Sequence, residues 1–392
     1  MSDFDQIHER QEDNSVKWDK YKGAEILPMW IADMDFRSPP MVIDAIKKKA
    51  DDGILAYGNP PKALSEIFVG LVADEYDWHI CEEQIVYING IVPALNMACR
   101  AFVGENEALI TAVPVYTPFL EVGENNNRYL HKIKAVLDDD GWHYPLAALS
   151  AALENNPEIR MLLLCNPFNP IGRSLSEEEL TEIVRLCLKH NVWICSDEIH
   201  CDLIFDDRKH IPIASLSGFA ESITITLMAP TKTYNLAGVG GSLVIIKDED
   251  MREAFNRARR GMSVDVSSLS YAAMLAAYRD CKAWIFDLID YLQTNRDYLM
   301  MRMAKLDDIE MNQVQGTYLA WLDVRKLGLN DPQDFFESAG VGMSPGSQYE
   351  GLGFMRLNFA CPRTLLVEAC DRIERAINER PPLQVAQTDS LS

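Results

Sequence analysis

The chain has 392 residues, of which 48% are apolar and 24% are charged, and its formal net charge is -22. This length accommodates a large domain plus a smaller one and excludes a single mini-domain. The negative charge, which no basic run offsets, argues against a nucleic-acid partner. No segment offers the roughly 18 consecutive apolar residues that a membrane helix requires. We therefore expect a protein with neither a nucleic-acid nor a membrane partner.

The start of the chain and the cysteines bear on the compartment. Residues 1–19 are polar and lack the apolar core of a secretory signal. The nine cysteines occur singly, without a Cys-x-x-Cys pair, and we interpret them as buried free thiols. These features predict a cytoplasmic protein without a metal site.

Short apolar runs alternate with helical patterns between about residues 84 and 247, which is typical of a mainly parallel sheet covered by helices. A helix is predicted at 93–102, and a second at 176–191, where Ser176 and Glu179 form a capping box. The runs without a polar alternate face are predicted to be buried strands, and they comprise 85–88, 108–113, 160–165, 192–195, 223–228 and 243–246. This part of the chain is therefore predicted to be an α/β domain.

Long helical patterns begin after residue 262. Helices are predicted at 268–279 and 283–306, followed by strand-like segments at 318–324 and 354–359. The predicted division of the chain is an N-terminal segment that packs with the small domain (1–45), a large domain (46–285), a small C-terminal domain (286–380) and a disordered tail (381–392).

Polar residues follow several of the predicted buried strands. Lys232, Asp197 and Asn169 each come just after such a strand, where open α/β sheets bind ligands. Each residue alone has an ordinary explanation, as a solvated lysine, a turn-capping acid or part of a turn. Gly90 precedes a helix start, whose free N–H groups suit a phosphate. Together these residues predict one ligand that uses a lysine, an acid, an amide and a phosphate-binding helix start.

Four motifs give the chain a family resemblance. They are Lys-Trp-Asp at 17–19, Leu-Pro-Met-Trp-Ile-Ala-Asp-Met-Asp-Phe at 27–36, Asp-Glu-Ile-His-Cys-Asp at 197–202 and Phe-Met-Arg-Leu-Asn-Phe-Ala-Cys-Pro-Arg at 354–363. With them the chain resembles the fold-type-I, pyridoxal-phosphate-dependent aminotransferase superfamily, and within it the cystathionine β-lyase or C–S lyase branch. The resemblance covers nearly the whole chain. It implies a large α/β domain with a mainly parallel seven-stranded sheet, a smaller α/β domain, and pyridoxal 5'-phosphate as cofactor.

The resemblance implies roles for residues around the cofactor ring. Lys232 would bind the cofactor covalently and move the proton at Cα. Asp197 would pair with the pyridine nitrogen, Asn169 would contact the ring hydroxyl and the substrate, and Tyr116 would stack on the ring. His200 stands where relatives often carry a tyrosine to the ring hydroxyl, so its role at the cofactor is open.

The resemblance also implies which residues bind the cofactor phosphate and the substrate. Backbone amides of the phosphate-binding turn would hold the phosphate, at Gly90, Ile91 and Val92. Tyr57 would reach the phosphate from a neighbouring subunit, which implies a homodimer with shared active sites. Arg356 would bind the substrate carboxylate, and Trp30 would line the substrate pocket.

The phosphate site departs from the wider family pattern. Ala229 and Gly240 occupy positions where relatives often have a hydroxyl residue and an arginine. Thr231 is an alternative hydroxyl donor, and no basic phosphate ligand is predicted.

The predicted reaction is β-elimination from an amino acid that carries sulfur on Cβ, which releases a thiol, pyruvate and ammonia. Transamination starts from the same carbanion and is the second alternative, and a different pyridoxal-phosphate reaction on a specialised amino acid is the third. The resemblance also extends to relatives that bind and restrain a transcription activator, which leaves a regulatory partner open. The intact set of Lys232, Asp197, Asn169 and Arg356 argues against a purely regulatory role.

Overall fold

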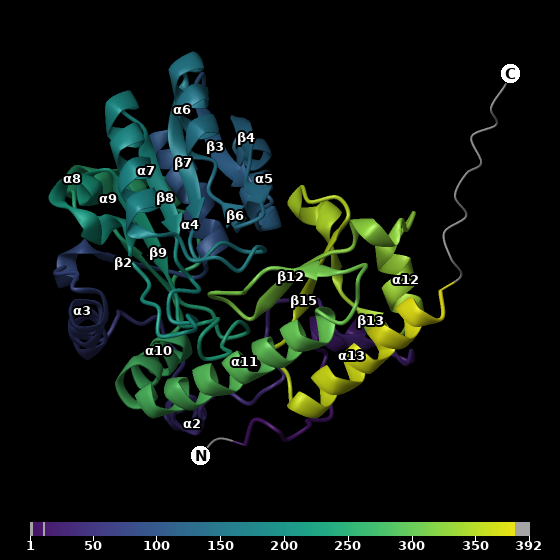
Figure 1. Ribbon diagram of the computed structural model, residues 1–392. Helices are drawn as coiled ribbons and strands as arrows, with labels where there is room; N and C mark the ends of the chain where they lie inside the picture. Colours follow the sequence, from purple (N-terminus) through teal and green to yellow (C-terminus); the bar gives the residue numbers. More distant parts are fainter. Residues whose placement is uncertain (1–2, 11, 381–392) are drawn as a thin grey trace, which may run out of the picture.

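The structure is a computed structural model that describes residues 3–10 and 12–380. It contains a seven-stranded sheet, a four-stranded sheet and two small two-stranded sheets. In Figure 1 the blue and teal part of the chain builds the larger sheet with its helices, and the green and yellow part builds the smaller sheet beside it. The predicted tail, 381–392, lies outside the described residues.

The larger sheet has the strand order β2-β10-β9-β8-β7-β3-β4. Its strands are β2 (Ile85–Ile88), β3 (Ala108–Val113), β4 (Tyr129–Lys134), β7 (Ile159–Cys165), β8 (Trp193–Asp197), β9 (Thr224–Met228) and β10 (Ser242–Ile245). Neighbours run parallel except at β10, which is antiparallel to β2 and β9. The six predicted apolar runs are confirmed as strands. The seventh strand, β4, is absent from the prediction because it is an edge strand in which only Ile133 is buried.

Helices pack around the larger sheet (Figure 1). They are α3 (Lys62–Tyr76), α4 (Ile91–Phe102), α5 (Thr117–Asn125), α6 (Leu146–Asn155), α7 (Glu177–His190), α8 (Gly218–Ser222), α9 (Glu249–Arg259) and α10 (Ser268–Asp280). The capping box of α7 is confirmed: Ser176 Oγ accepts from the Glu179 amide, and the Glu179 carboxylate accepts from the Ser176 amide. The helix predicted at 93–102 begins two residues earlier, at Ile91. Pro93 fits in its first turn because the N–H that proline lacks has no helical partner there.

The smaller sheet has the order β11-β12-β15-β14. Its strands are β11 (Glu310–Met311), β12 (Leu319–Asp323), β14 (Ser344–Pro345) and β15 (Phe354–Asn358), and its helices are α11 (Lys282–Met303), α12 (Pro332–Ser338) and α13 (Arg363–Asn378). The predicted domain boundary at 285 and 286 falls inside α11. The division of the chain into domains therefore stays a prediction.

The N-terminal residues join the two parts of the molecule. After α1 (Val16–Asp19), β1 (Leu27–Pro28) pairs in parallel with β13 (Val341–Gly342), and α2 (Pro40–Asp51) packs on α10. The segment between β1 and α2 thus runs from the smaller sheet to the helices of the larger one. The remaining elements are a hairpin of β5 (Val136–Asp138) with β6 (Gly141–His143), and the short 3-10 helices η1 (Glu82–Gln84), η2 (Ile213–Leu216), η3 (Arg325–Leu327) and η4 (Gly346–Tyr349).

All nine cysteines are free thiols, and eight are buried. The prediction of a buried thiol is wrong for Cys81, which is exposed because it lies on the surface turn that precedes η1. Within the described ranges, no helix is long and apolar enough to cross a membrane.

Candidate active site

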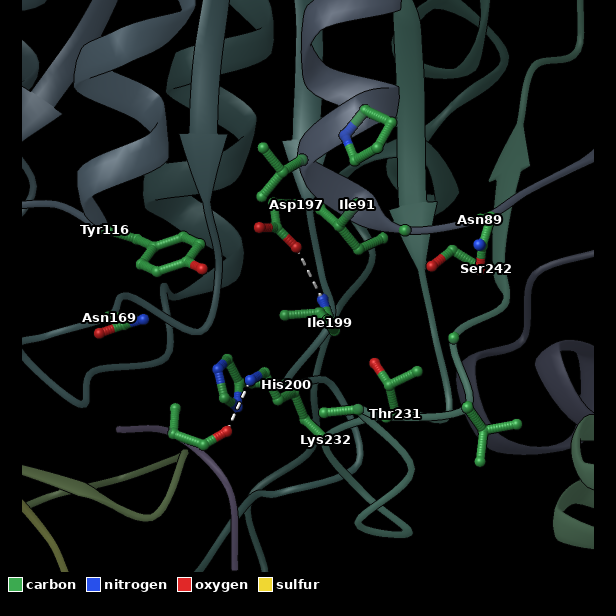
Figure 2. A pocket seen from close by; sticks show the side chains of 18 of the residues that line it. Asn89, Ile91, Tyr116, Asn169, Asp197, Ile199, His200, Thr231, Lys232 and Ser242 are labelled. Carbon is green, nitrogen blue, oxygen red and sulfur yellow. Dashed lines mark hydrogen bonds between the residues drawn. The ribbon is translucent and has the colours of Figure 1, made fainter. Parts of the chain in front are cut away.

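A cavity of about 410 Å³ opens at the carboxyl ends of β7, β8 and β9. Most of the predicted site residues line it, namely Gly90, Ile91, Val92, Tyr116, Asn169, Asp197, His200, Thr231 and Lys232. Figure 2 shows Tyr116, Asn169, Asp197, His200 and Lys232 around one space. The parallel strands bring these residues together because their carboxyl ends meet at one edge of the sheet.

Lys232 lies in the loop after β9, and its side chain reaches into the cavity. The Lys232 Nζ donates a 2.6 Å hydrogen bond to the Ala32 carbonyl, drawn as a dashed line in Figure 2. Burial, followed by the nearby positive charge of Arg356, lowers the pKa of Lys232 to about 8. A lysine of this kind can give up and take up a proton near neutral pH.

Asp197 ends β8 and is only 3% exposed. Its Oδ1 accepts a 3.1 Å hydrogen bond from the Ile199 amide. Burial raises the pKa of Asp197 to about 7, against the opposing effects of the Ile199 amide and of the Lys232 charge. A buried carboxylate gains most from a facing cation or a proton donor. A protonated ring nitrogen in the cavity would be both.

Arg356 lies on β15 of the smaller sheet and contacts Asn169, which lines the cavity. Its NH1 donates to Asn169 Oδ1 at 3.1 Å, and its NH2 donates to the Trp30 carbonyl at 2.9 Å. The guanidinium also lies over the Tyr349 ring, 4.6 Å from the ring centroid. The buried Nε has no hydrogen-bond partner among the residues that the structure describes. An unpartnered donor of a buried guanidinium fits a carboxylate ligand.

Two rings flank the cavity. Tyr116 follows β3 and directly precedes α5; burial, and then the charge of Asp197, raise the pKa of its hydroxyl. His200 is buried, and burial together with Lys232 and Arg356 lowers its pKa to about 3. His200 is therefore neutral, and its Nδ1 has no partner within the described ranges. A neutral imidazole has one donor and one acceptor nitrogen, so Nδ1 can donate or accept one hydrogen bond according to the tautomer.

The end of the cavity near α4 is rich in hydrogen-bond donors. The helix begins at Ile91, directly after Gly90, so the amides of Ile91 and Val92 are free of helical partners. The hydroxyl residues Thr231 and Ser242 line the same end, and the buried Ser242 Oγ has no partner in the described part of the chain. Ser242 was missed in the sequence because a lone serine at the start of an apolar run carries no signal.

The glycine at position 240 has a steric explanation. A Cβ on Gly240 would lie 2.2 Å from Asn89 Oδ1, which itself accepts from the Gly241 amide at 3.2 Å. Gly240 also has a positive φ of 75°. A side chain there would collide with Asn89 and strain the backbone.

Three predicted residues do not line the cavity: Tyr57, Trp30 and Arg356, of which Arg356 contacts the lining residue Asn169. Tyr57 lies in the loop between α2 and α3 and is fully exposed. Trp30 is half-buried, and its indole N–H donates to the Lys17 carbonyl at 2.9 Å, so the Trp30 backbone rather than the ring contacts Arg356. Their predicted roles stay predictions.

The fold is that of the fold-type-I enzymes of the aminotransferase superfamily. The chain belongs to the aminotransferase class I and II family, which it matches over residues 25–373. Cystathionine beta-lyase PatB of Bacillus subtilis (strain 168) is 35% identical to it, over 96% of this chain and 100% of PatB.

Two solved structures are similar over nearly the whole chain. The crystal structure of OvoB has a TM-score of 0.94 at 37% identity, and covers 97% of this chain and 100% of OvoB. The crystal structure of cystalysin from Treponema denticola, which contains a pyridoxal 5'-phosphate cofactor, has a TM-score of 0.92 at 30% identity. It covers 96% of this chain and 99% of cystalysin.

Proposed function

We propose that this chain is a pyridoxal 5'-phosphate-dependent C–S β-lyase that releases pyruvate, ammonia and a thiol from a sulfur-containing amino acid. The observation that carries the proposal is that Lys232, Asp197 and Asn169 line one cavity and that Arg356 donates a hydrogen bond to Asn169. The name of PatB as a cystathionine beta-lyase and the cofactor of cystalysin support it.

The residues of the cavity fit the cofactor. Asp197 offers a buried carboxylate to the ring nitrogen, and the free amides of Ile91 and Val92 with the hydroxyl of Ser242 offer donors to the phosphate. Lys232 offers an amine whose lowered pKa suits covalent attachment to an aldehyde. When bound, the cofactor draws electrons from the bonds at the substrate Cα.

With the cofactor bound, Arg356, Lys232 and Asp197 would each have a different role in the reaction. Arg356 binds the substrate carboxylate and sets the orientation of the Cα–H bond toward Lys232. The neutral Lys232 amine accepts the Cα proton, and the bond from Cβ to sulfur breaks with the electron pair leaving on the thiolate. Asp197 stays ionised and holds the proton on the ring nitrogen.

The active unit is proposed to be a cytoplasmic homodimer. Exposed apolar residues on the loop that carries Tyr57 support a covering second copy: Ile54 is 72% exposed and Leu55 is 64% exposed. The same loop lies beside the start of α10, because a Cβ on Gly58 would lie 3.5 Å from the Ser268 Cβ. A regulatory partner stays a prediction from the resemblance.

The test is pyruvate release from L-cystathionine by the purified protein with its cofactor, together with a visible absorption scan. We expect pyruvate from the wild type and a loss of at least about 100-fold in Lys232→Ala, because a general base is removed. Lys189→Ala, which changes a surface pair with Glu154, is the control and should match the wild type. Amino-group transfer to keto acids without pyruvate would favour transamination, and no visible cofactor band would refute the proposal.

A further inference from the structure

The motif Trp-Ile-Ala-Asp-Met-Asp-Phe forms a strap, defined here as residues 30–36, between β1 and α2. Apart from Asp35, every carbonyl of the strap accepts a hydrogen bond from a side chain. The donors are Arg356 and Ser344 to residue 30, Asn358 to residues 31 and 33, Lys232 and Tyr318 to residue 32, Lys17 to residue 33, Arg10 and Asn235 to residue 34, and Asn235 to residue 36. The strap is thus held through its backbone by side chains from both sheets.

Two of these donors are the side chains that the proposed reaction needs most. Lys232 Nζ meets the Ala32 carbonyl at 2.6 Å, and Arg356 NH2 meets the Trp30 carbonyl at 2.9 Å. The path of the strap backbone therefore sets where both cations lie. A displacement of the strap would move them relative to each other.

The strap is anchored at its far end by a buried ion pair. Lys17 is fully buried, and its Nζ donates to Asp35 Oδ2 at 2.8 Å and to the Asp33 carbonyl at 3.2 Å. The other oxygen of Asp35 accepts from the Trp18 indole at 2.9 Å and from Arg10 at 3.1 Å. The Lys-Trp-Asp motif at 17–19 thus supplies two of the three donors to Asp35.

A fully buried lysine needs an explanation beyond stability. A buried ion pair seldom stabilises a fold more than apolar residues of the same volume would, whereas removing one partner leaves an uncompensated charge. The geometry of the pair is directional, because Lys17 can satisfy Asp35 and the Asp33 carbonyl only when the strap follows its present path. This makes the pair suited to fixing a backbone path.

We propose that Lys17 is a positioning residue: through its ion pair with Asp35 it holds the strap so that the Ala32 and Trp30 carbonyls orient Lys232 and Arg356. The expected effect on kcat and KM rests on the proposed function. The expected effect of Lys17 on the position of the strap does not. Lys17 is not among the residues that line the cavity.

The experiment compares three variants with the wild-type holoenzyme. Lys17→Met breaks the ion pair, and Asn358→Ala removes the donors to the carbonyls of residues 31 and 33 from the opposite side. Arg302→Met is the matched control, because Arg302 is a nearly buried cation that bridges Asp371 and Glu374 between α11 and α13, away from the strap. Each variant is measured for kcat, KM, melting temperature and hydrogen exchange of the peptides that contain 30–36.

We expect Lys17→Met and Asn358→Ala to raise strap exchange and to lower kcat/KM by roughly 10- to 100-fold, the effect of a small misplacement at a reaction centre. Their effects should be less than multiplicative in the double variant, because both act through one segment. Lys17→Arg, which keeps the charge, should recover part of the loss. Arg302→Met should lower the melting temperature and leave kcat, KM and strap exchange unchanged.

Wild-type kcat and KM in Lys17→Met would overturn the inference, as would lost activity without a change in strap exchange. Multiplicative losses would also contradict it. If Lys17→Met does not fold, Lys17→Arg and Asn358→Ala decide the outcome by the same measurements. If the wild type releases no pyruvate, the proposed function fails instead. The role of the strap is then tested by its hydrogen exchange and by the affinity of the holoprotein for amino acids, read from visible absorption. Lys17→Met should weaken this affinity.

Discussion

The two walls of the cavity are built by different means. On the side of the larger sheet, Asp197, Asn169 and Lys232 line the cavity from strand ends and the loops that follow them. On the opposite side, the strap presents backbone carbonyls, and side chains such as Asn358 act on the site only by holding that backbone. The comparison teaches that a substitution on the sheet side removes a chemical group, whereas one on the strap side moves groups that remain.

The electrostatics of the two walls also differ. The sheet side buries a carboxylate whose pKa rises to about 7, and the strap places carbonyl oxygens against Lys232 of the sheet side and against Arg356 of the smaller sheet. A cofactor between the walls would face an acid on one side and a cation for the substrate carboxylate on the other. Substitutions on the sheet side should therefore change mainly turnover, and substitutions on the opposite side should change mainly substrate binding.

The sharpest test of the sheet side is Asp197→Asn. We expect turnover to fall by at least about 100-fold with the cofactor still bound, because a neutral amide cannot hold a proton on the ring nitrogen. Turnover by pyruvate release and cofactor content by absorption check this, with the exposed Asp138→Asn as control. Turnover within a few-fold of the wild type would remove Asp197 from its role.

In the absence of cofactor, Asp197→Asn should be more stable than the wild type. Burial raises the pKa of Asp197 from 3.8 to about 7, so the folded state binds this proton more tightly than the unfolded chain does. The stability that this proton contributes is present at acidic pH and is lost as pH rises from about 4 to about 7. At pH 8 Asp197→Asn should therefore melt roughly 2–5 °C higher than the wild type, and an equal or lower melting temperature would contradict this reasoning.

On the smaller-sheet side, Arg356→Lys should act mainly on substrate binding. A lysine keeps the charge but loses the planar fork, so we expect KM to rise by about 10- to 100-fold with a smaller change in kcat. Arg325→Lys, at a partly exposed pair with Asp323 on the same sheet, is the control. A fall in kcat at constant KM would place Arg356 in the chemistry and would break the contrast between the walls.

The pH dependence of kcat should show the smallest effect. Lys232 accepts the Cα proton only as a neutral amine, and its pKa is lowered to about 8. Activity should therefore be lost as pH falls below about 8, by up to about tenfold per pH unit, and reach a plateau above it. A profile that is flat between pH 6 and 9, or that falls as pH rises through 8, would contradict this role for Lys232.

Much of the fold and of the sheet side was predictable from local pattern. The buried strands lack a polar face, and Lys232, Asp197 and Asn169 follow them directly, so the rule for parallel sheets was enough to bring the three together. The edge strand β4 escaped prediction because edge strands need not be apolar. The serine at 242 escaped because only its burial without a partner makes it notable.

The sequence by itself determined which side chains are available for the chemistry, because strand period, capping and strand-end position are local properties. It also marked the motifs at 17–19 and 27–36 as distinctive, but not what they do. Only the tertiary structure decided that Lys17 reaches Asp35 and that Lys232 reaches the Ala32 carbonyl, 200 residues apart in the chain. Contacts of this kind depend on a backbone path, and a carbonyl oxygen carries no residue identity for a pattern to detect.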